Sequence, residues 1–205
     1  MARSFSDDER QHIRQALIDK GRDIFIRYGL RKTSVEDIAT AVGISKGSFY
    51  NFFRSKEHLF FEIREIEEQE LKTNFLEEVF PNGEVNRGTL RAFLTGMFKS
   101  VERSPFLAIL MNEGEREYLF RKIPPRELEA HQKSDIAFLT ELVVQWQEKG
   151  VVRCDLPSGQ VVGIIASLLA IPLMRELLPI ENYDEMIGLL SDIVISGLLQ
   201  PEGKA

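Results

Sequence analysis

Residues 45–51 gather several side chains that can form hydrogen bonds with a charged partner. They are Ser45, Lys46, Ser48, Tyr50 and Asn51, which offer hydroxyl, ammonium and amide groups. Such groups can donate to phosphate oxygens and can reach the edges of bases in a major groove. The stretch is therefore a candidate for nucleic-acid recognition. The alternative is an ordinary helical hairpin with a polar face.

The residues before this stretch predict a short helix and a tight turn. Apolar side chains recur at helical spacing at Val35, Ile38, Ala39 and Val42. The helix is expected to begin at Thr33 or Ser34, with Thr33 and Glu36 as a capping box. Gly43 supplies the turn backbone, and a second short helix is expected over about residues 45–52. Two short helices that cross at such a turn form a helix-turn-helix. The small core that they share is predicted to consist of Ile38, Val42, Ile44 and Phe49.

The rest of the chain is predicted to be helical almost throughout, because strand-like alternation never persists. Further helices are expected over about residues 6–28, 55–76, 86–102, 124–149, 157–179 and 182–199, and another begins at residue 104. The helix of residues 6–28 is expected to begin with a capping box of Ser6 and Glu9 and to end at Gly29. The predicted fold is therefore all-α. An N-terminal three-helix head with the helix-turn-helix is joined, through the helix of residues 55–76, to a C-terminal bundle of about six helices. The domain boundaries that follow are 1–54 and 55–205.

Charge is distributed unevenly along the 205 residues. The formal net charge is −6, but residues 1–56 carry +4 and residues 57–205 carry −10. A basic head on an acidic body suggests that only one end meets a polyanion. Chance alone could produce such a difference, so the asymmetry serves as a consistency check on the motif.

Other classes of function find little support. Cys154 is the single cysteine and has no nearby histidine, and no two of His12, His58 and His131 have the spacing of metal ligands. We therefore expect no catalytic residues, no metal and no cofactor. The first residues contain no apolar core region, and the longest uncharged run is too short to span a membrane. A soluble, cytoplasmic protein without membrane contact is expected.

Residues 25–60 resemble the signature of the tetracycline-repressor (TetR) family of transcriptional regulators. The ordered match is carried by Phe25, Gly29, Thr33 to Val35, Asp37 to Ala39, Ala41, Gly43, Ser45 to Tyr50, Phe53 and Ser55 to Leu59. It covers the first quarter to third of the chain. Beyond about residue 75 the chain is similar to the family only in length, helix count and style.

The resemblance implies a set of DNA contacts. These would be Thr33, Ser45, Lys46, Gly47, Ser48, Tyr50, Asn51 and Lys56. Thr33, Tyr50 and Lys56 would bind phosphates, Gly47 would let the helix approach closely, and Ser48 or Asn51 would reach bases. As alternatives, Thr33 could be a simple cap and Lys56 a solvated surface charge.

The helices of residues 157–179 and 182–199 carry more apolar positions than one buried face requires. They predict a homodimer interface that includes Ile165, Leu168, Leu169, Leu190, Ile193 and Val194. The alternative is that both helices are central in a monomeric bundle. Aromatic and methionine residues could line a pocket for a small apolar or amphipathic effector, or could simply be core. The residues selected for the pocket are Phe93, Met97, Met111, Phe138 and Trp146.

Together these features predict a ligand-responsive dimeric repressor. It would bind a palindromic operator in double-stranded DNA and would be released by a small effector. The alternative is a DNA-binding regulator without a small effector, either constitutive or controlled by a protein partner.

Overall fold

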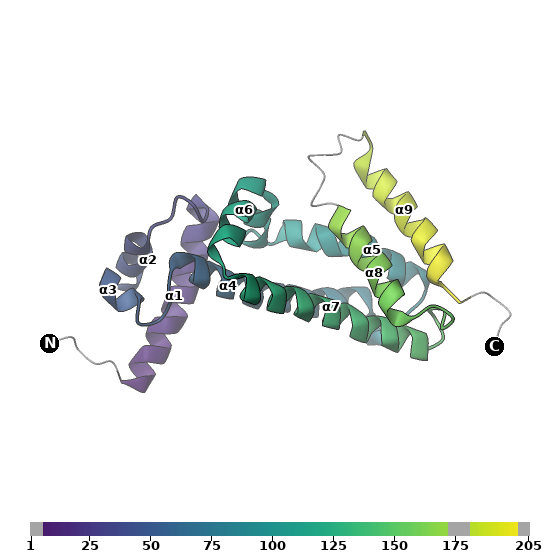
Figure 1. Cartoon of the computed structure of the whole chain (residues 1–205), viewed down its shortest axis with the longest axis horizontal. Coiled ribbons are helices and arrows are strands. Elements are labelled where there is room, and N and C mark those ends of the chain that lie inside the picture. The colour runs from purple at the N-terminus through teal and green to yellow at the C-terminus, as the bar shows by residue number, and fades with distance from the viewer. Residues whose placement is uncertain (1–5, 172–180, 201–205) are drawn as a thin grey trace. The chain divides into compact units, whose positions relative to one another are not determined.

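A computed structural model describes residues 6–171 and 181–200 (Figure 1), and within them the all-α prediction is confirmed. The described residues form α-helices and short 3-10 helices, with one isolated antiparallel bridge between Val152 and Leu199. The chain divides into two compact units. The first unit comprises Met1–Glu70 with Glu102–Pro125, and the second comprises Leu71–Val101 with Arg126–Ala205.

The first unit begins with α1 (Asp7–Tyr28), and both of its predicted ends are confirmed. Ser6 and Glu9 form the expected capping box, with the Glu9 amide 3.2 Å from the Ser6 Oγ and the Ser6 amide 2.9 Å from the Glu9 carboxylate. At the C-terminus Gly29 has a φ of 79°, which a residue with a Cβ rarely adopts. α1 therefore begins and ends where local side-chain chemistry favours it.

The core of the first unit is aromatic and involves residues distant in sequence. The Phe60 ring, on α4 (Lys56–Val79), lies 5.1 Å from that of Phe25 on α1 and 4.6 Å from that of Phe106. All three side chains are buried. Because Phe106 belongs to the later segment of residues 102–125, this segment completes the core of the first unit.

That segment differs from the single helix expected to begin at residue 104. It forms a 3-10 helix, η2 (Leu107–Met111), and then α6 (Glu113–Lys122). Asn112 separates them, and its side chain accepts a hydrogen bond from the Glu115 amide at 3.1 Å, as an N-cap does. The compact unit around the head thus extends beyond residues 1–54. A functional boundary between residues 54 and 55 stays a prediction.

The second unit has a core of packed aromatic rings. Its main elements are α5 (Arg87–Arg103), α7 (Pro125–Glu148), α8 (Ser158–Ala170) and α9 (Tyr183–Leu198), with the 3-10 helix η1 (Pro81–Gly83) between α4 and α5. The Trp146 ring lies 5.4 Å from that of Phe93 and 5.7 Å from that of Phe80. α5 and α9 are also joined by an ion pair between Arg91 and Asp192, at 2.9 Å.

The residues predicted to line an effector pocket are mostly packed into one core. Phe93 and Trp146 are buried against each other, and Met97 and Phe138 pack against the same core while partly exposed. Met111 lies in η2 and so belongs to the first unit. Four of the five side chains therefore contribute to the core of the second unit, as the alternative interpretation expected.

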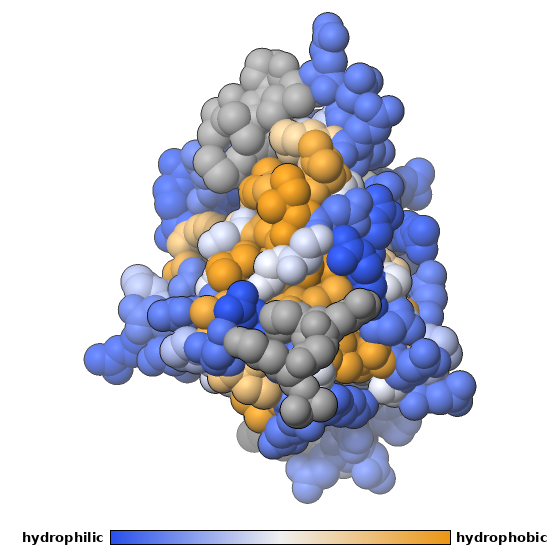
Figure 2. Space-filling view, turned by 90° about the vertical axis from the view of Figure 1, so that its right-hand side faces the viewer, coloured by the Kyte–Doolittle hydropathy of each residue, from blue (hydrophilic) through white to orange (hydrophobic). Residues whose placement is uncertain are grey.

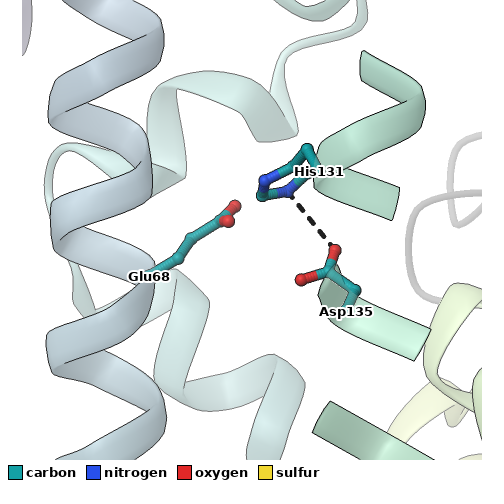
Figure 3. Close-up of side chains that lie close together, drawn as sticks. All are labelled: Glu68, His131 and Asp135. Atoms are coloured by element: carbon teal, nitrogen blue, oxygen red, sulfur yellow. Dashed lines mark ion pairs between the residues drawn. The ribbon is translucent and has the colours of Figure 1, made fainter. Parts of the chain in front are cut away.

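Polar contacts also fix α7 within the second unit. His131 and Asp135 stand one turn apart, with His131 Nε2 3.3 Å from the Asp135 carboxylate (Figure 3). The same carboxylate accepts a hydrogen bond from the Lys72 ammonium at 2.6 Å, and Lys72 also lies 5.2 Å from the centre of the Phe138 ring. These contacts tie the last turns of α4 to α7.

α8 and α9 leave apolar side chains uncovered. Ile164, Leu189 and Ile193 are 41 %, 63 % and 61 % exposed, and we call these three residues the apolar face. A groove of about 700 Å³ runs between α8 and α9, with Gly163, Ile164 and Val194 among its lining residues. Figure 2 shows apolar residues gathered at the centre of this side of the molecule, with polar residues around them.

The predicted dimer residues divide between this groove and the core. Ile165 and Leu168 are buried in the core of the second unit, although Leu168 also lines the groove. Leu169, Leu190 and Val194 are partly buried, and Ile193 alone of the six is strongly exposed. Ile164 and Leu189, which are exposed, are not among the six. Of the helices described for residues 6–171 and 181–200, none combines the length and apolar character that crossing a membrane requires.

Candidate nucleic-acid interface

The predicted pair of short helices forms around Gly43. α2 (Val35–Val42) ends at Gly43, whose φ of 77° and ψ of 28° are left-handed. The Ile44 amide then donates to the Ala39 carbonyl at 3.0 Å, which closes the helix end. α3 (Lys46–Phe49) follows, with Ser45 as its N-cap. The arrangement is the helix-turn-helix that the spacing predicts.

α3 is shorter than the expected helix of residues 45–52, but the chain continues as tight turns. The Asn51 amide donates to the Ser48 carbonyl at 3.1 Å, and the Phe52 amide donates to that of Phe49 at 2.9 Å. Phe49 is fully buried, and its ring lies 5.9 Å from that of Phe53. This anchor fixes one side of α3 against the head and leaves the other side outward.

The outward side carries four of the eight predicted DNA contacts. Lys46, Gly47, Tyr50 and Asn51 are exposed, and we call these four residues the reading surface. Half of the Tyr50 side chain is accessible, although its ring packs edge-on against Phe49. An added Cβ at Gly47 would have as its nearest neighbour only the Ser45 Oγ, at 3.8 Å. The surface thus has room to meet a flat or grooved partner closely.

The two predicted serines are partly engaged inside the motif. Ser45 Oγ accepts a hydrogen bond from the Ser48 amide at 3.0 Å and lies 2.9 Å from the Ser48 Oγ. The Ser45 hydroxyl therefore caps α3, and the Ser48 hydroxyl is bonded to it. A hydroxyl oxygen has two acceptor positions and one donor, so Ser48 retains capacity for a further contact.

An ion pair joins α2 and α3 across the reading surface. The Lys46 ammonium donates to the Glu36 carboxylate at 2.5 Å, and both side chains are exposed. This hydrogen bond lowers the pKa of Glu36 and raises the pKa of Lys46. Lys46 is therefore charged at neutral pH but already faces an anion of the same chain. A phosphate would compete with Glu36 for it.

A hollow of about 440 Å³ opens beside the N-terminus of α2. Arg31, Lys32, Lys46, Tyr50 and Lys56 are among the residues that line it. Cationic side chains next to a helix N-terminus, where amide hydrogens point outward, form an environment that favours anions. Glu36 and Glu57 line the hollow as well, so four cationic side chains there outnumber two carboxylates.

Thr33 does not cap α2, which corrects the predicted capping box. The N-cap is Ser34, which accepts from the Asp37 amide at 3.2 Å, while its own amide donates to the Asp37 carboxylate at 2.9 Å. Thr33 is only 3 % exposed, and its hydroxyl donates to the Gly29 carbonyl at 2.7 Å. Its hydroxyl proton is thus already committed within the chain.

Lys56 also differs from the expected surface charge. Its ammonium donates to three backbone carbonyls, those of Leu30 at 2.8 Å, Arg31 at 3.1 Å and Thr33 at 2.6 Å. Burial lowers the pKa of this ammonium. Because an ammonium has three donors, these contacts occupy all of them. The geometry therefore argues against the phosphate contact predicted for Lys56.

Comparisons with known proteins agree with this geometry. Residues 17–63 match the model of the family described as bacterial regulatory proteins, tetR family. The transcriptional repressor KstR2 of Rhodococcus jostii is 29 % identical to the chain over 165 residues, which is 80 % of this chain and 74 % of the relative. Both matches concern regulators of transcription.

Solved structures share the fold. A TetR-family transcriptional regulator from Pectobacterium atrosepticum superposes with a TM-score of 0.70 at 16 % identity, covering 96 % of this chain and 99 % of the other. The ketosteroid transcriptional regulator KstR2 of Mycobacterium tuberculosis superposes with a TM-score of 0.52 at 22 % identity, covering 92 % and 95 %. Residues 17–63 thus carry the helix-turn-helix of the tetR family of bacterial regulatory proteins, and the all-helical fold of the chain is similar to that of these regulators.

Proposed function

We propose that the protein is a dimeric transcriptional repressor that binds a palindromic operator and is released by a small effector. The observation that carries the proposal is the helix-turn-helix itself. Its buried Phe49 anchors α3, while Lys46, Gly47, Tyr50 and Asn51 remain exposed on the outward side. In a helix-turn-helix protein, side chains in this position enter the major groove.

Within the motif, the contacts divide by chemistry. Lys46 and Tyr50 line the hollow beside α2 and would bind phosphates there, together with Arg31 and Lys32. Asn51, Ser48 and the exposed side of Gly47 would face base edges. Ser45 and Thr33 would act mainly by holding α3 and the preceding loop in place, since their hydroxyls already have partners in the chain.

The apolar face of α8 and α9 supports the dimer. Exposed isoleucine and leucine side chains beside an open groove are costly in water, and a second copy of the same face would bury them. Two-fold pairing also suits a palindrome, because each half-site then meets an identical head. The interface would centre on Ile164, Leu189 and Ile193, with Leu190 and Val194 at the groove.

The proposal of a small effector is supported more by the structural relatives than by the packed core of the second unit. One structural relative is a ketosteroid transcriptional regulator, and another is a fatty acid degradation regulator from Bacillus halodurans. The aromatic core of the second unit would suit an apolar or amphipathic ligand of that kind if it opened. The mutual packing of Phe93 and Trp146 instead favours the second candidate, a regulator without a small effector.

Selection of DNA from a random pool of duplexes by the full-length protein tests the proposal. The expected product is an inverted repeat that binds two protomers, with affinity lost in Lys46→Ala and Tyr50→Ala. If no duplex is enriched over the pool, the proposed function is wrong. Progesterone and palmitic acid, added to the complex, then test release. If neither weakens binding, the candidate without an effector of these classes is favoured.

A further inference from the structure

The loop between α1 and α2, residues 29–33, has its carbonyl groups held by side chains. The Lys56 ammonium binds those of Leu30, Arg31 and Thr33, and the Thr33 hydroxyl binds that of Gly29. These acceptors stand on four of five consecutive residues, and Leu30 is fully buried. The path of the loop is thus set from one side by α4, which carries Lys56.

α6 holds the same loop through an amide. The Arg31 amide donates to the Glu115 carboxylate at 3.1 Å. A Cβ added to Gly29 would lie 3.0 Å from the other oxygen of that carboxylate, so Glu115 packs directly against the loop. The Asn112 side chain caps α6 by accepting a hydrogen bond from the Glu115 amide. This bond fixes the backbone from which the Glu115 side chain extends. The loop is therefore held by both its carbonyl and its amide groups.

A third contact joins α6 to the first turn of α4. The Tyr118 hydroxyl donates to the buried Glu57 carboxylate at 2.7 Å, and the Lys56 ammonium lies 5.6 Å from the centre of the Tyr118 ring. Burial and the bond to Glu57 raise the pKa of Tyr118 to about 12. Tyr118 thus keeps its proton at neutral pH and secures α6 beside Lys56.

The loop leads directly into the candidate interface. Arg31 and Lys32 line the hollow beside α2. Ser34, which directly follows the loop, is the N-cap of that helix. A shift of the loop would therefore move two cations and the N-terminus of α2 together. Residues that fix the loop can change DNA affinity without touching DNA.

We propose that Lys56 and Glu115 are positioning residues that hold the loop of residues 29–33 in its DNA-binding conformation, with Lys56 acting through the loop instead of through a phosphate. This inference rests on the proposed DNA-binding function. A phosphate contact by Lys56 would require it to release one of these carbonyls, and its two shorter bonds, to Leu30 and Thr33, are partly buried, so only the exposed Arg31 carbonyl could be given up to water.

Replacement of Glu115 tests the proposal, because electrostatics and loop positioning predict opposite changes in DNA affinity. Glu115→Ala removes a negative charge from the head, so simple electrostatics predicts equal or tighter binding to a polyanion. Loss of loop positioning predicts weaker binding instead, about tenfold if the competent fraction falls to about a tenth. Glu115→Gln keeps an acceptor for the Arg31 amide and is expected to bind close to the wild type.

Hydrogen exchange of the Arg31 amide reports directly on the loop. Full-length wild type and Glu115→Gln are expected to protect this amide, and Glu115→Ala is expected to expose it while the melting temperature changes little. Affinity is measured by fluorescence anisotropy on a duplex that the wild type itself selects. Equal affinity of Glu115→Ala and wild type, or a tightening, would overturn the role of Glu115.

The salt dependence separates the two roles of Lys56. Lys56→Met keeps the apolar stem and removes all three donors, and it is expected to weaken binding with an unchanged slope of log Kd against log salt. The matched control is Lys32→Ala, an exposed cation at the hollow, for which the slope is expected to fall by about 0.9. A fall of that size in Lys56→Met would overturn its positioning role.

Failure of the proposed DNA-binding function and misfolding of a variant can each be distinguished from failure of the positioning role. If the wild type selects no duplex, the proposed function fails, whereas hydrogen exchange at Arg31 still shows whether Glu115 holds the loop. If Lys56→Met does not fold, as circular dichroism would show, Lys56→Arg replaces it. Arg keeps the charge with a different donor geometry, so weaker binding at an unchanged slope supports positioning, and wild-type affinity overturns it.

Discussion

The reading surface of the head and the apolar face of α8 and α9 are both exposed, but they are built by different means. Lys46, Tyr50 and their neighbours stand on a helix of four residues that is held by a glycine turn, a serine cap and one buried ring. Ile164, Leu189 and Ile193 stand on helices of 13 and 16 residues that are apolar on most sides.

The two surfaces would bind their partners through different interactions. The reading surface offers donors and charge, whose effect depends on ionic strength and on the geometry of the acceptors. The apolar face offers apolar surface, and its contribution to binding depends on how much of that surface is buried and hardly on the salt concentration. In a regulator that uses both, the reading surface would determine which DNA is bound, and the apolar face would determine the oligomeric state.

Disruption of the apolar face should give the largest effect. Leu189→Asp together with Ile193→Asp places two charges where a second copy would pack, and we expect monomers at micromolar concentration. Binding to an inverted repeat should weaken by about 100-fold, because the second head is no longer tethered to the first. Analytical ultracentrifugation and anisotropy measure the two effects.

The control for this pair is Ile136→Asp on α7. Ile136 is 47 % exposed, so the same change of an exposed isoleucine is made outside the apolar face. We expect this variant to behave as the wild type does. If Ile136→Asp also gave monomers, or if the double variant stayed dimeric, α8 and α9 would not be the interface.

On the reading surface, Lys46→Ala should weaken DNA binding by about tenfold at low salt and reduce the salt slope by about 0.9. Tyr50→Phe should weaken it by a similar factor with the slope unchanged, because only a neutral donor is lost. Anisotropy titrations over a range of potassium chloride concentrations separate these outcomes. Equal slopes in both variants would show that Lys46 stays paired with Glu36 on DNA.

Two glycines test how far each region depends on its backbone. Gly43 and Gly159 both have open space around an added Cβ, but Gly43 has a φ of 77° and Gly159 lies in α8. Gly43→Ala should lower the free energy of unfolding by about 1 kcal/mol because of the left-handed backbone. Gly159→Ala should raise it by about 0.5–1 kcal/mol. Urea denaturation measures both, and equal effects would show that the turn tolerates a Cβ.

One further effect is confined to alkaline pH. The pKa of Tyr118 is raised to about 12 in the folded protein, above the usual value of 10.0. The folded state therefore holds this proton more tightly than the unfolded chain, so the stabilisation is complete below pH 10 and is lost as the pH rises towards 12. Tyr118→Phe should flatten the fall in melting temperature over that range. An unchanged pH profile would mean that the bond to Glu57 adds nothing.

Features fixed by local chemistry could be predicted from the sequence. The capping box of Ser6 and Glu9 and the breaks at Gly29 and Gly43 each depend on residues within one helical turn. The predicted cap at Thr33 was wrong by one residue. The sequence TSVED contains two overlapping boxes, Thr33 with Glu36 and Ser34 with Asp37, and spacing alone does not choose between them.

Features that depend on distant contacts could not be predicted. The partners of Lys56 lie 23 to 26 residues earlier, and the core ring Phe106 lies 46 residues after Phe60, so neither environment leaves a local pattern. On α8, apolar residues at both 164 and 165 allow either to face the core. The structure buries Ile165 and exposes Ile164. Composition likewise did not distinguish a pocket from the packed rings of Phe93 and Trp146.

The first unit is assembled from two stretches of chain, and this affects how such a regulator can be re-engineered. A graft that transferred only residues 1–54 to another body would leave behind Phe60, Phe106 and Leu119, all buried in the native molecule. It would also leave behind Glu115 and Tyr118. A chimera with a transplanted DNA specificity therefore needs residues 55–70 and 102–125 to travel with the head, or a recipient whose own segments offer the same rings and carboxylate.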